Sequence, residues 1–167
     1  MTSIYHATPY DISATGFYFN TYEEYQIKSA THRNEHGALV EEYEIQFIDG
    51  ENSRLFSALS VCQASLKDWF EHFEALEGED TIKAIYLAEE QCCLMSDILD
   101  RLDDVYLFEG TALEYTENYL EDTGLLEQIP ENLRFYFDTE SFARDLLLGG
   151  DIAELEINDT AYIVQSS

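Results

Sequence analysis

Residues 40–48 read VEEYEIQFI, and apolar side chains occupy every second position from Tyr43 to Phe47. Successive side chains of a β-strand point to opposite faces, so Tyr43, Ile45 and Phe47 share one face and glutamates cover the other. The following Asp49-Gly50 pair is typical of a turn. This stretch therefore predicts a half-buried strand, and it indicates that the chain around it is a sheet.

The residues before this strand support the same interpretation. Residues 3–7 and 16–19 are short β-branched or aromatic runs separated by turn-forming residues, which predicts two further strands. Residues 21–29 have helical spacing, with Asn20 as the expected N-cap.

From Ser60 onward the apolar period becomes helical. We expect Ser60 to cap a helix that ends at Gly78, and Asp80 and Ser96 to begin two more. The apolar residues expected inside are Leu66, Trp69, Phe70, Phe73 and Leu76 in the first helix, Ile82, Ile85 and Tyr86 in the second, and Ile98, Leu99 and Leu102 in the third.

The last third mixes both periods. Residues 105–108 predict a strand, and Thr111 with Glu114 forms a capping-box pattern that begins a helix reaching about Asp122. A short helix at Pro130 and a longer one from Asp138 or Thr139 to Gly149 follow. Residues 152–157 and 160–164, joined by Asn158-Asp159, predict a closing hairpin.

These patterns predict an α+β fold in three small parts. They are a β-rich N-terminal domain (residues 1–60), a helical acidic middle domain (residues 61–103) and a mixed C-terminal domain (residues 104–167).

The charge of the chain is strongly one-sided. Its 167 residues carry 35 Asp plus Glu against 8 Lys plus Arg, a formal net charge of −27, although 46 % of the residues are hydrophobic and can form a core. Nucleic acids and anionic membranes bind basic surfaces, so we expect neither as a partner. The sequence contains neither an apolar run long enough to span a membrane nor a secretory signal, and its three cysteines make no disulfide framework. We therefore expect a cytoplasmic protein.

The acidic residues are densest in the middle of the chain, where 17 of them lie between Asp68 and Asp122 against two basic residues. Many repeat at intervals of three or four, which places carboxylates along one face of a helix. Since like charges at this spacing repel, a sequence adjusted only for stability would mix both signs. The candidate partner-binding carboxylates are Asp68, Glu71, Glu74, Asp97, Asp100, Asp103, Asp104, Glu109, Glu114, Glu117, Glu121 and Asp122.

Patterns for catalysis or cofactor binding are weak. Asp122-Thr-Gly124 matches the aspartic-protease tripeptide, but it falls at a helix end and has no second copy. His32 and His36 do not have the order of a zinc-binding helix motif, and residues 97–109 lack the alternating ligands of a calcium loop. We expect no enzyme activity, no bound metal and no cofactor.

Residues 122–146, DTGLLEQIPENLRFYFDTESFARDL, resemble the C-terminal signature of the ArdA antirestriction family. The specific parts are Gly124-Leu125, Ile129-Pro-Glu131, Tyr136-Phe-Asp138 and Phe142-Ala-Arg-Asp-Leu146. Residues 16–20 are similar to an early family element, with Tyr18 in place of Trp and Asn20 in place of Asp. Residues 103–115 lie where the acidic antirestriction motif of the family is expected.

This resemblance implies an elongated, dimeric DNA mimic carried by conjugative plasmids, transposons or phages. Such proteins occupy the DNA-binding groove of the methyltransferase core of type I restriction-modification enzymes, and they block restriction and in some cases modification. The family dimer forms through the C-terminal domain. We expect Tyr106, Leu107 and Phe108 to be dimer contacts, because an apolar strand beside Gly110 needs cover.

The sequence leaves other functions open. A DNA mimic could instead target a CRISPR effector or a nucleoid protein, since a basic cleft is common to all of them. A carboxylate-rich metal-dependent hydrolase and a plain acidic scaffold module are further alternatives.

Overall fold

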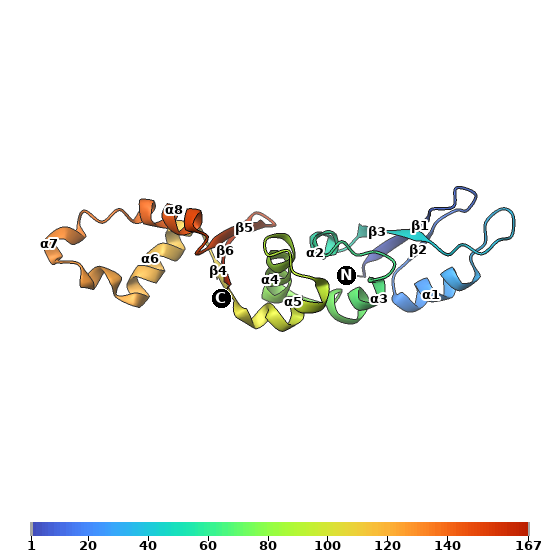
Figure 1. The fold of residues 1–167 in the computed structure, drawn as a ribbon, viewed down its shortest axis with the longest axis horizontal. Coiled ribbons are helices and arrows are strands. Elements are labelled where there is room, and N and C mark those ends of the chain that lie inside the picture. Colours follow the sequence, from blue (N-terminus) through green and yellow to red (C-terminus); the bar gives the residue numbers. More distant parts are fainter. Residues whose placement is uncertain (1, 167) are drawn as a thin grey trace. The chain divides into compact units, whose positions relative to one another are not determined.

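The computed structural model describes residues 2–166, which form helices and two three-stranded antiparallel sheets (Figure 1). The predicted α+β class is confirmed, with strands first, helices in the middle and a second sheet with helices at the end. The chain divides into two compact units, with the division between Met95 and Ser96. In the described residues, no helix combines the length and apolarity needed to cross a membrane.

The N-terminal sheet has the strand order β2-β1-β3 and consists of β1 (Ile4–Pro9), β2 (Phe17–Phe19) and β3 (Tyr43–Asp49). Tyr5 pairs with Phe19 on one side of β1, and Ala7 pairs with Ile45 on the other. The predicted alternation of β3 is confirmed, because Tyr43 and Ile45 are buried while the alternating residues Glu44 and Gln46 are exposed.

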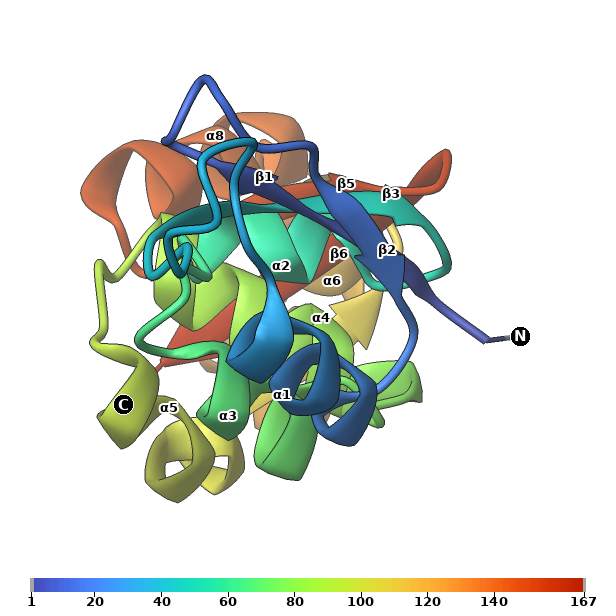
Figure 2. The ribbon, with the colours of Figure 1, turned by 90° about the vertical axis from the view of Figure 1, so that its right-hand side faces the viewer.

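Helices α1 (Tyr22–Thr31) and α3 (Leu66–Asp68) lie on the same side of this sheet (Figures 1 and 2). The other helical elements of this unit are α2 (Ser53–Ala58), the π-helical turn η1 (Trp69–Phe73) and α4 (Gly78–Glu89). Leu66, Trp69 and Phe73 are buried as predicted.

The helix starts differ from the sequence prediction. Thr21, not Asn20, caps α1, since its hydroxyl accepts from the Glu24 amide at 3.1 Å. The Asn20 side chain instead donates to the Ser3 carbonyl at 2.8 Å, tying the loop to β1.

The long helix predicted from Ser60 to Gly78 is also wrong. Ser60 has a left-handed φ of 50°, which interrupts the helical backbone after α2. The segment 66–73 is helical only in the short pieces α3 and η1. Asp80 lies inside the first turn of α4 rather than at its cap, which is Glu77.

An aromatic cluster around Tyr5 forms the centre of the N-terminal unit. The Tyr5 ring packs against Phe19, Phe47 and Phe70 at centroid distances of 5.4, 5.1 and 5.1 Å, and its hydroxyl accepts from Trp69 Nε1 at 2.9 Å. Burial raises the pKa of Tyr5 to about 12, so the phenol stays neutral. These contacts cross residue 60, and the division into three domains stays a prediction.

The C-terminal unit contains a sheet of order β4-β6-β5, made of β4 (Val105–Glu109), β5 (Ala153–Ile157) and β6 (Thr160–Ser166). Asn158 and Asp159 have φ values of 51° and 62°, the left-handed pair that a tight two-residue hairpin turn requires, so the predicted closing hairpin is confirmed. The helices are α5 (Met95–Arg101), η2 (Leu102–Asp104), α6 (Ala112–Thr123), η3 (Leu125–Gln128), α7 (Glu131–Arg134) and α8 (Thr139–Gly149).

The ends of α6 and α8 nearest the sheet pack on it, and α7 lies at the far end of the loop between them (Figure 1). The core here consists of Ala112, Tyr115, Ala143, Ile152 and Ile163, with Phe108, Leu146 and Leu147 packed against it. Leu99, predicted to face inward, is 36 % exposed, because α5 is short and buries only Ile98.

We predict that Trp69→Phe destabilises β1 and α4 together. The change removes the buried donor to Tyr5 and leaves a small cavity, at a cost of about 1–3 kcal/mol. Native-state hydrogen exchange of the full chain measures this, and amides of both β1 and α4 should lose protection. Loss confined to residues 66–89, with β1 unchanged, would support a separate middle domain and contradict a single N-terminal core.

Candidate acidic interface

Helix α6 carries a buried stripe and an acidic stripe on different faces. Ala112, Thr116 and Leu120 recur at intervals of four and are buried. Glu114, Glu117 and Glu121 follow a second line and are exposed. A helix fixed through its buried stripe therefore presents its carboxylates in a defined row.

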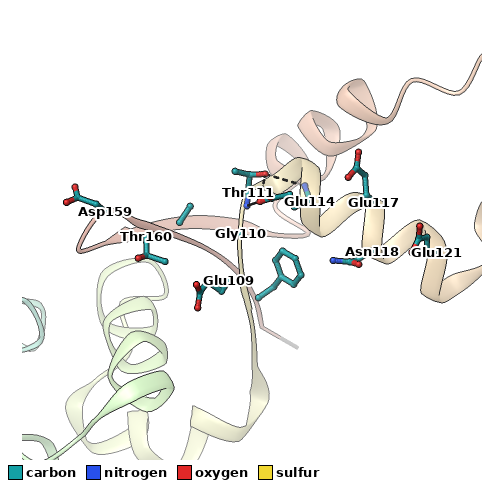
Figure 3. Close-up of a pocket in the computed structure, with 11 residues that line it drawn as sticks. Glu109, Gly110, Thr111, Glu114, Glu117, Asn118, Glu121, Asp159 and Thr160 are labelled. Atoms are coloured by element: carbon teal, nitrogen blue, oxygen red, sulfur yellow. Dashed lines mark hydrogen bonds between the residues drawn. The ribbon is translucent and has the colours of Figure 1, made fainter.

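An acidic groove of about 650 Å³ lies where this row meets the sheet (Figure 3). Its carboxylates are Glu109 from the end of β4, Glu114, Glu117 and Glu121 from α6, and Asp159 from the β5–β6 turn. The structure thus brings together four of the carboxylates singled out in the sequence.

Asp159 was missed by sequence reasoning. It was assigned to the hairpin turn, and no spacing within the sequence connects it with α6. It lies 50 positions after Glu109, and only the pairing of β4 with β6 brings the two to one groove.

The capping box fixes the N-terminal end of the groove. The Glu114 carboxylate accepts from the Thr111 backbone amide at 2.8 Å and from the Thr111 hydroxyl at 3.0 Å, and the Glu114 amide donates back to that hydroxyl. These hydrogen bonds, first of all the one from the backbone amide, hold the pKa of Glu114 below its ordinary value. The predicted capping box is confirmed, and the carboxylate is charged at neutral pH.

Gly110 makes this arrangement possible. Its φ of 145° is open to glycine, and a Cβ atom there would lie 2.7 Å from the Phe108 ring and 2.9 Å from Glu114 Oε2. A larger residue would push the carboxylate out of the capping box or move the β4–α6 connection.

The other candidate carboxylates lie elsewhere in the two units. Asp68 ends α3, while Glu71 lies in η1 and pairs with Lys67 Nζ at 3.4 Å. Glu74 follows η1 and is half-buried. The exposed residues Asp97 and Asp100 lie on α5, Asp103 and Asp104 on η2, and Asp122 in the last turn of α6. None of these residues lines the acidic groove.

The three expected dimer contacts lie on β4, which is an edge strand of the C-terminal sheet. Tyr106 is 57 % exposed, whereas Leu107 and Phe108 are half-buried and Phe108 packs on the core of its own unit. Their role between two chains stays a prediction.

Among residues 2–166, no three or more His, Cys, Asp or Glu side chains converge closely enough to hold an ion. The row of carboxylates on α6 is instead spread along the helix, which suits a partner with several separated positive charges.

We predict that the contribution of Glu114 to stability depends on pH. The fold lowers the pKa of the Glu114 carboxyl, so the charged carboxylate gives its full stabilisation at a pH above its ordinary pKa of 4.5. This stabilisation is lost as the pH falls through the lower pKa of the folded state. Thermal unfolding should show Glu114→Gln less stable than the wild type at pH 7, with the difference shrinking below pH 4.5. Glu117→Gln, outside the capping box, controls for the change in net charge. A Glu114→Gln deficit that persists unchanged in acid would contradict the capping role.

A search of curated proteins gives no match for this chain. The model of the antirestriction protein family ArdA matches residues 5–159. These residues include all of β1 except Ile4, the whole of β2 to β5 and of α6, and the acidic groove except Thr160 and Ala161. Because this match covers most of the 167 residues, the chain belongs to the ArdA family of antirestriction proteins.

Proposed function

We propose that this protein blocks type I restriction-modification enzymes by mimicking double-stranded DNA. Family membership implies antirestriction activity, and the further step rests on the carboxylates. The observation that carries the proposal is the acidic groove, where Glu109, Glu114, Glu117, Glu121 and Asp159 line one surface.

The total charge supports a comparison with DNA. Duplex DNA carries one negative charge per roughly 1.7 Å of its axis, so 35 carboxylates equal the charge of about 60 Å of duplex, or somewhat under twenty base pairs. A methyltransferase core that holds phosphates with lysine and arginine offers matching positive charges. The inhibitor acts stoichiometrically, and it releases no product.

The fold supports this function through fixed positions. The carboxylates of α6 belong to a helix whose opposite face is buried, so little ordering is needed when a partner binds. Each exposed ion pair between a carboxylate of this chain and a basic residue of the enzyme contributes little to the free energy of binding, typically under about 1 kcal/mol. Affinity therefore arises from many such ion pairs. Both surfaces release counterions on binding, so affinity falls steeply with salt.

The direct test is a titration of a purified type I methyltransferase core, already bound to labelled duplex DNA, with the full chain. The proposal expects release of DNA near one dimer per enzyme, weakening as salt rises. A folded protein that releases no DNA at low salt would overturn the assignment to that enzyme, and an affinity purification would then look for a CRISPR effector or a nucleoid protein.

We predict that the triple variant Glu109→Gln, Glu117→Gln, Glu121→Gln displaces DNA roughly ten-fold less well than the wild type, while each single change costs less than about five-fold. The salt dependence of displacement should also become shallower, because fewer ions are released. Glu114 is left in place so that the capping box and the fold are preserved.

The matched control is Glu23→Gln, Glu35→Gln, Glu51→Gln, which removes the same charge from exposed positions outside the groove. It should weaken displacement less than the groove variant. Equal effects would show that total charge alone matters, and abolition by one single change in a folded chain would contradict a surface of many weak contacts.

We also propose that two chains associate along the free edge of β4. The Gly110 amide donates to the Ala161 carbonyl at 2.9 Å, so by alternation Tyr106 and Phe108 direct their amides to β6 and Leu107 directs its amide outward. An edge with unpaired backbone groups is a template for a second strand. Tyr106, Leu107 and Phe108 would then contribute contacts beside the pairing.

Leu107→Pro should therefore abolish the dimer with the monomer intact, because proline removes only the outward amide and is tolerated on an edge strand. Sedimentation equilibrium of the full chain measures this, with Leu107→Val as the control that keeps the amide. A proline variant that remains dimeric would place the interface elsewhere.

A further inference from the structure

A second cavity of about 280 Å³, which we name the tyrosine slot, adjoins the acidic groove. It is lined by Tyr106 and Phe108 of β4 and by Tyr115, Asn118, Tyr119 and Asp122 of α6. Phe108 and Asn118 also line the groove, so the two cavities share a wall. The slot is at the small end of ligand cavities, a size that suits one side chain rather than a larger ligand.

The spacing of these aromatic residues follows the periodicity of a strand in β4 and of a helix in α6. Tyr106 and Phe108 are two positions apart on a strand and share one face of the sheet. Tyr115 and Tyr119 are four apart on α6 and share a helix face, and Asp122 continues that line. The acidic stripe of α6 runs directly beside this aromatic one.

The rings are held in defined positions around Tyr115. Tyr115 is buried and contacts Phe108 at a centroid distance of 5.6 Å and an interplanar angle of 76°. Tyr119 stacks beside it at 6.3 Å and 17°, and Tyr106 lies at 6.5 Å. The Tyr115 hydroxyl donates to Gln165 Oε1 at 3.2 Å, which fixes the floor of the slot to β6.

In a single chain the walls of the slot are open to solvent. Tyr106 is 57 % and Tyr119 is 38 % exposed. Single exposed aromatic residues are common, but several rings around one cavity with a carboxylate at its rim are the usual surroundings of a bound organic cation.

We propose that the tyrosine slot takes the guanidinium group of an arginine from the DNA-binding surface of the partner enzyme. The inference rests on the proposed function and adds to it a contact between one cation and aromatic rings. The acidic groove attracts several cations through charge, whereas the slot would hold one cation against aromatic faces while Asp122 accepts its hydrogen bonds.

Arginine fits this site better than lysine. Its guanidinium is planar and weakly hydrated, so it stacks on a tyrosine face and keeps its N–H groups directed at a carboxylate. A lysine ammonium is compact and strongly hydrated, and it loses more solvation on entering an aromatic cavity. Arginine and tyrosine are also the residues that most often dominate binding energy at interfaces.

The first test uses the full chain alone and does not depend on any enzyme. N-acetyl-arginine amide is titrated into the protein and followed by NMR, with N-acetyl-lysine amide as the comparison. Ring signals of Tyr119 and Tyr106 should shift with the arginine probe. Tyr119→Leu keeps an apolar side chain without a π face, and in this variant the Tyr106 signal should no longer shift. An absent shift, or an equal one with the lysine probe, would overturn the proposal.

The second test uses DNA displacement from a type I methyltransferase core. Tyr119→Leu should weaken displacement by about 2- to 30-fold without changing its salt dependence, because tyrosine carries no charge. Tyr119→Phe keeps the ring and should retain displacement. Tyr10→Leu, at an exposed tyrosine outside the slot, is the matched control and should behave as the wild type.

The outcomes separate this inference from the proposed function. If the wild type displaces DNA and Tyr119→Leu displaces it equally well, the slot carries no arginine and the function stands. If the wild type displaces no DNA, the proposed function fails while the NMR titration still decides the slot. If Tyr119→Leu changes the mass measured by sedimentation, a second copy covers the slot and the inference is overturned.

Discussion

Repulsion among 35 carboxylates, with only 8 basic residues to relieve it, is the constraint on which this structure depends. Each like-charged pair at helical spacing costs a few tenths of a kcal/mol, whereas burying one large apolar side chain contributes about 1.5–3 kcal/mol. One buried ring such as Trp69 therefore offsets several repulsive pairs. The fold places its carboxylates outside and relies on aromatic clusters, around Tyr5 in one unit and Tyr115 in the other, to hold them there.

Helix α6 connects this balance of forces with function. Its buried stripe is fixed by the β4-β6-β5 sheet and α8, so the carboxylates on the opposite face cannot move apart. Glu114 is restrained further by the capping box, which Gly110 leaves room for. A stable surface of like charge is costly for an isolated protein, and it is useful to one whose partner supplies the missing positive charges.

Local patterns were enough to predict much of the fold. The alternation in residues 40–48, the Thr111–Glu114 capping box and the Asn158-Asp159 turn all depend on neighbouring residues, and each is confirmed. Helix α2 is not predicted from the sequence, because six residues are too few to show a helical apolar period.

Features that depend on distant residues could not be predicted in the same way. The spacing of Glu114, Glu117 and Glu121 predicts their row on one helix. The addition of Asp159 to the groove and the hydrogen bond of Tyr115 to Gln165 depend instead on the pairing of β4 with β6. Residue patterns specify which side chains share an element, while the sheet decides which elements meet.

A cryo-electron microscopy structure of the full chain bound to a type I methyltransferase core would test the central claim most directly. DNA mimicry predicts that the acidic groove faces the lysine and arginine residues that hold DNA phosphates in the DNA-bound enzyme. A complex in which the chain binds away from that surface, with the groove open to solvent, would contradict DNA mimicry.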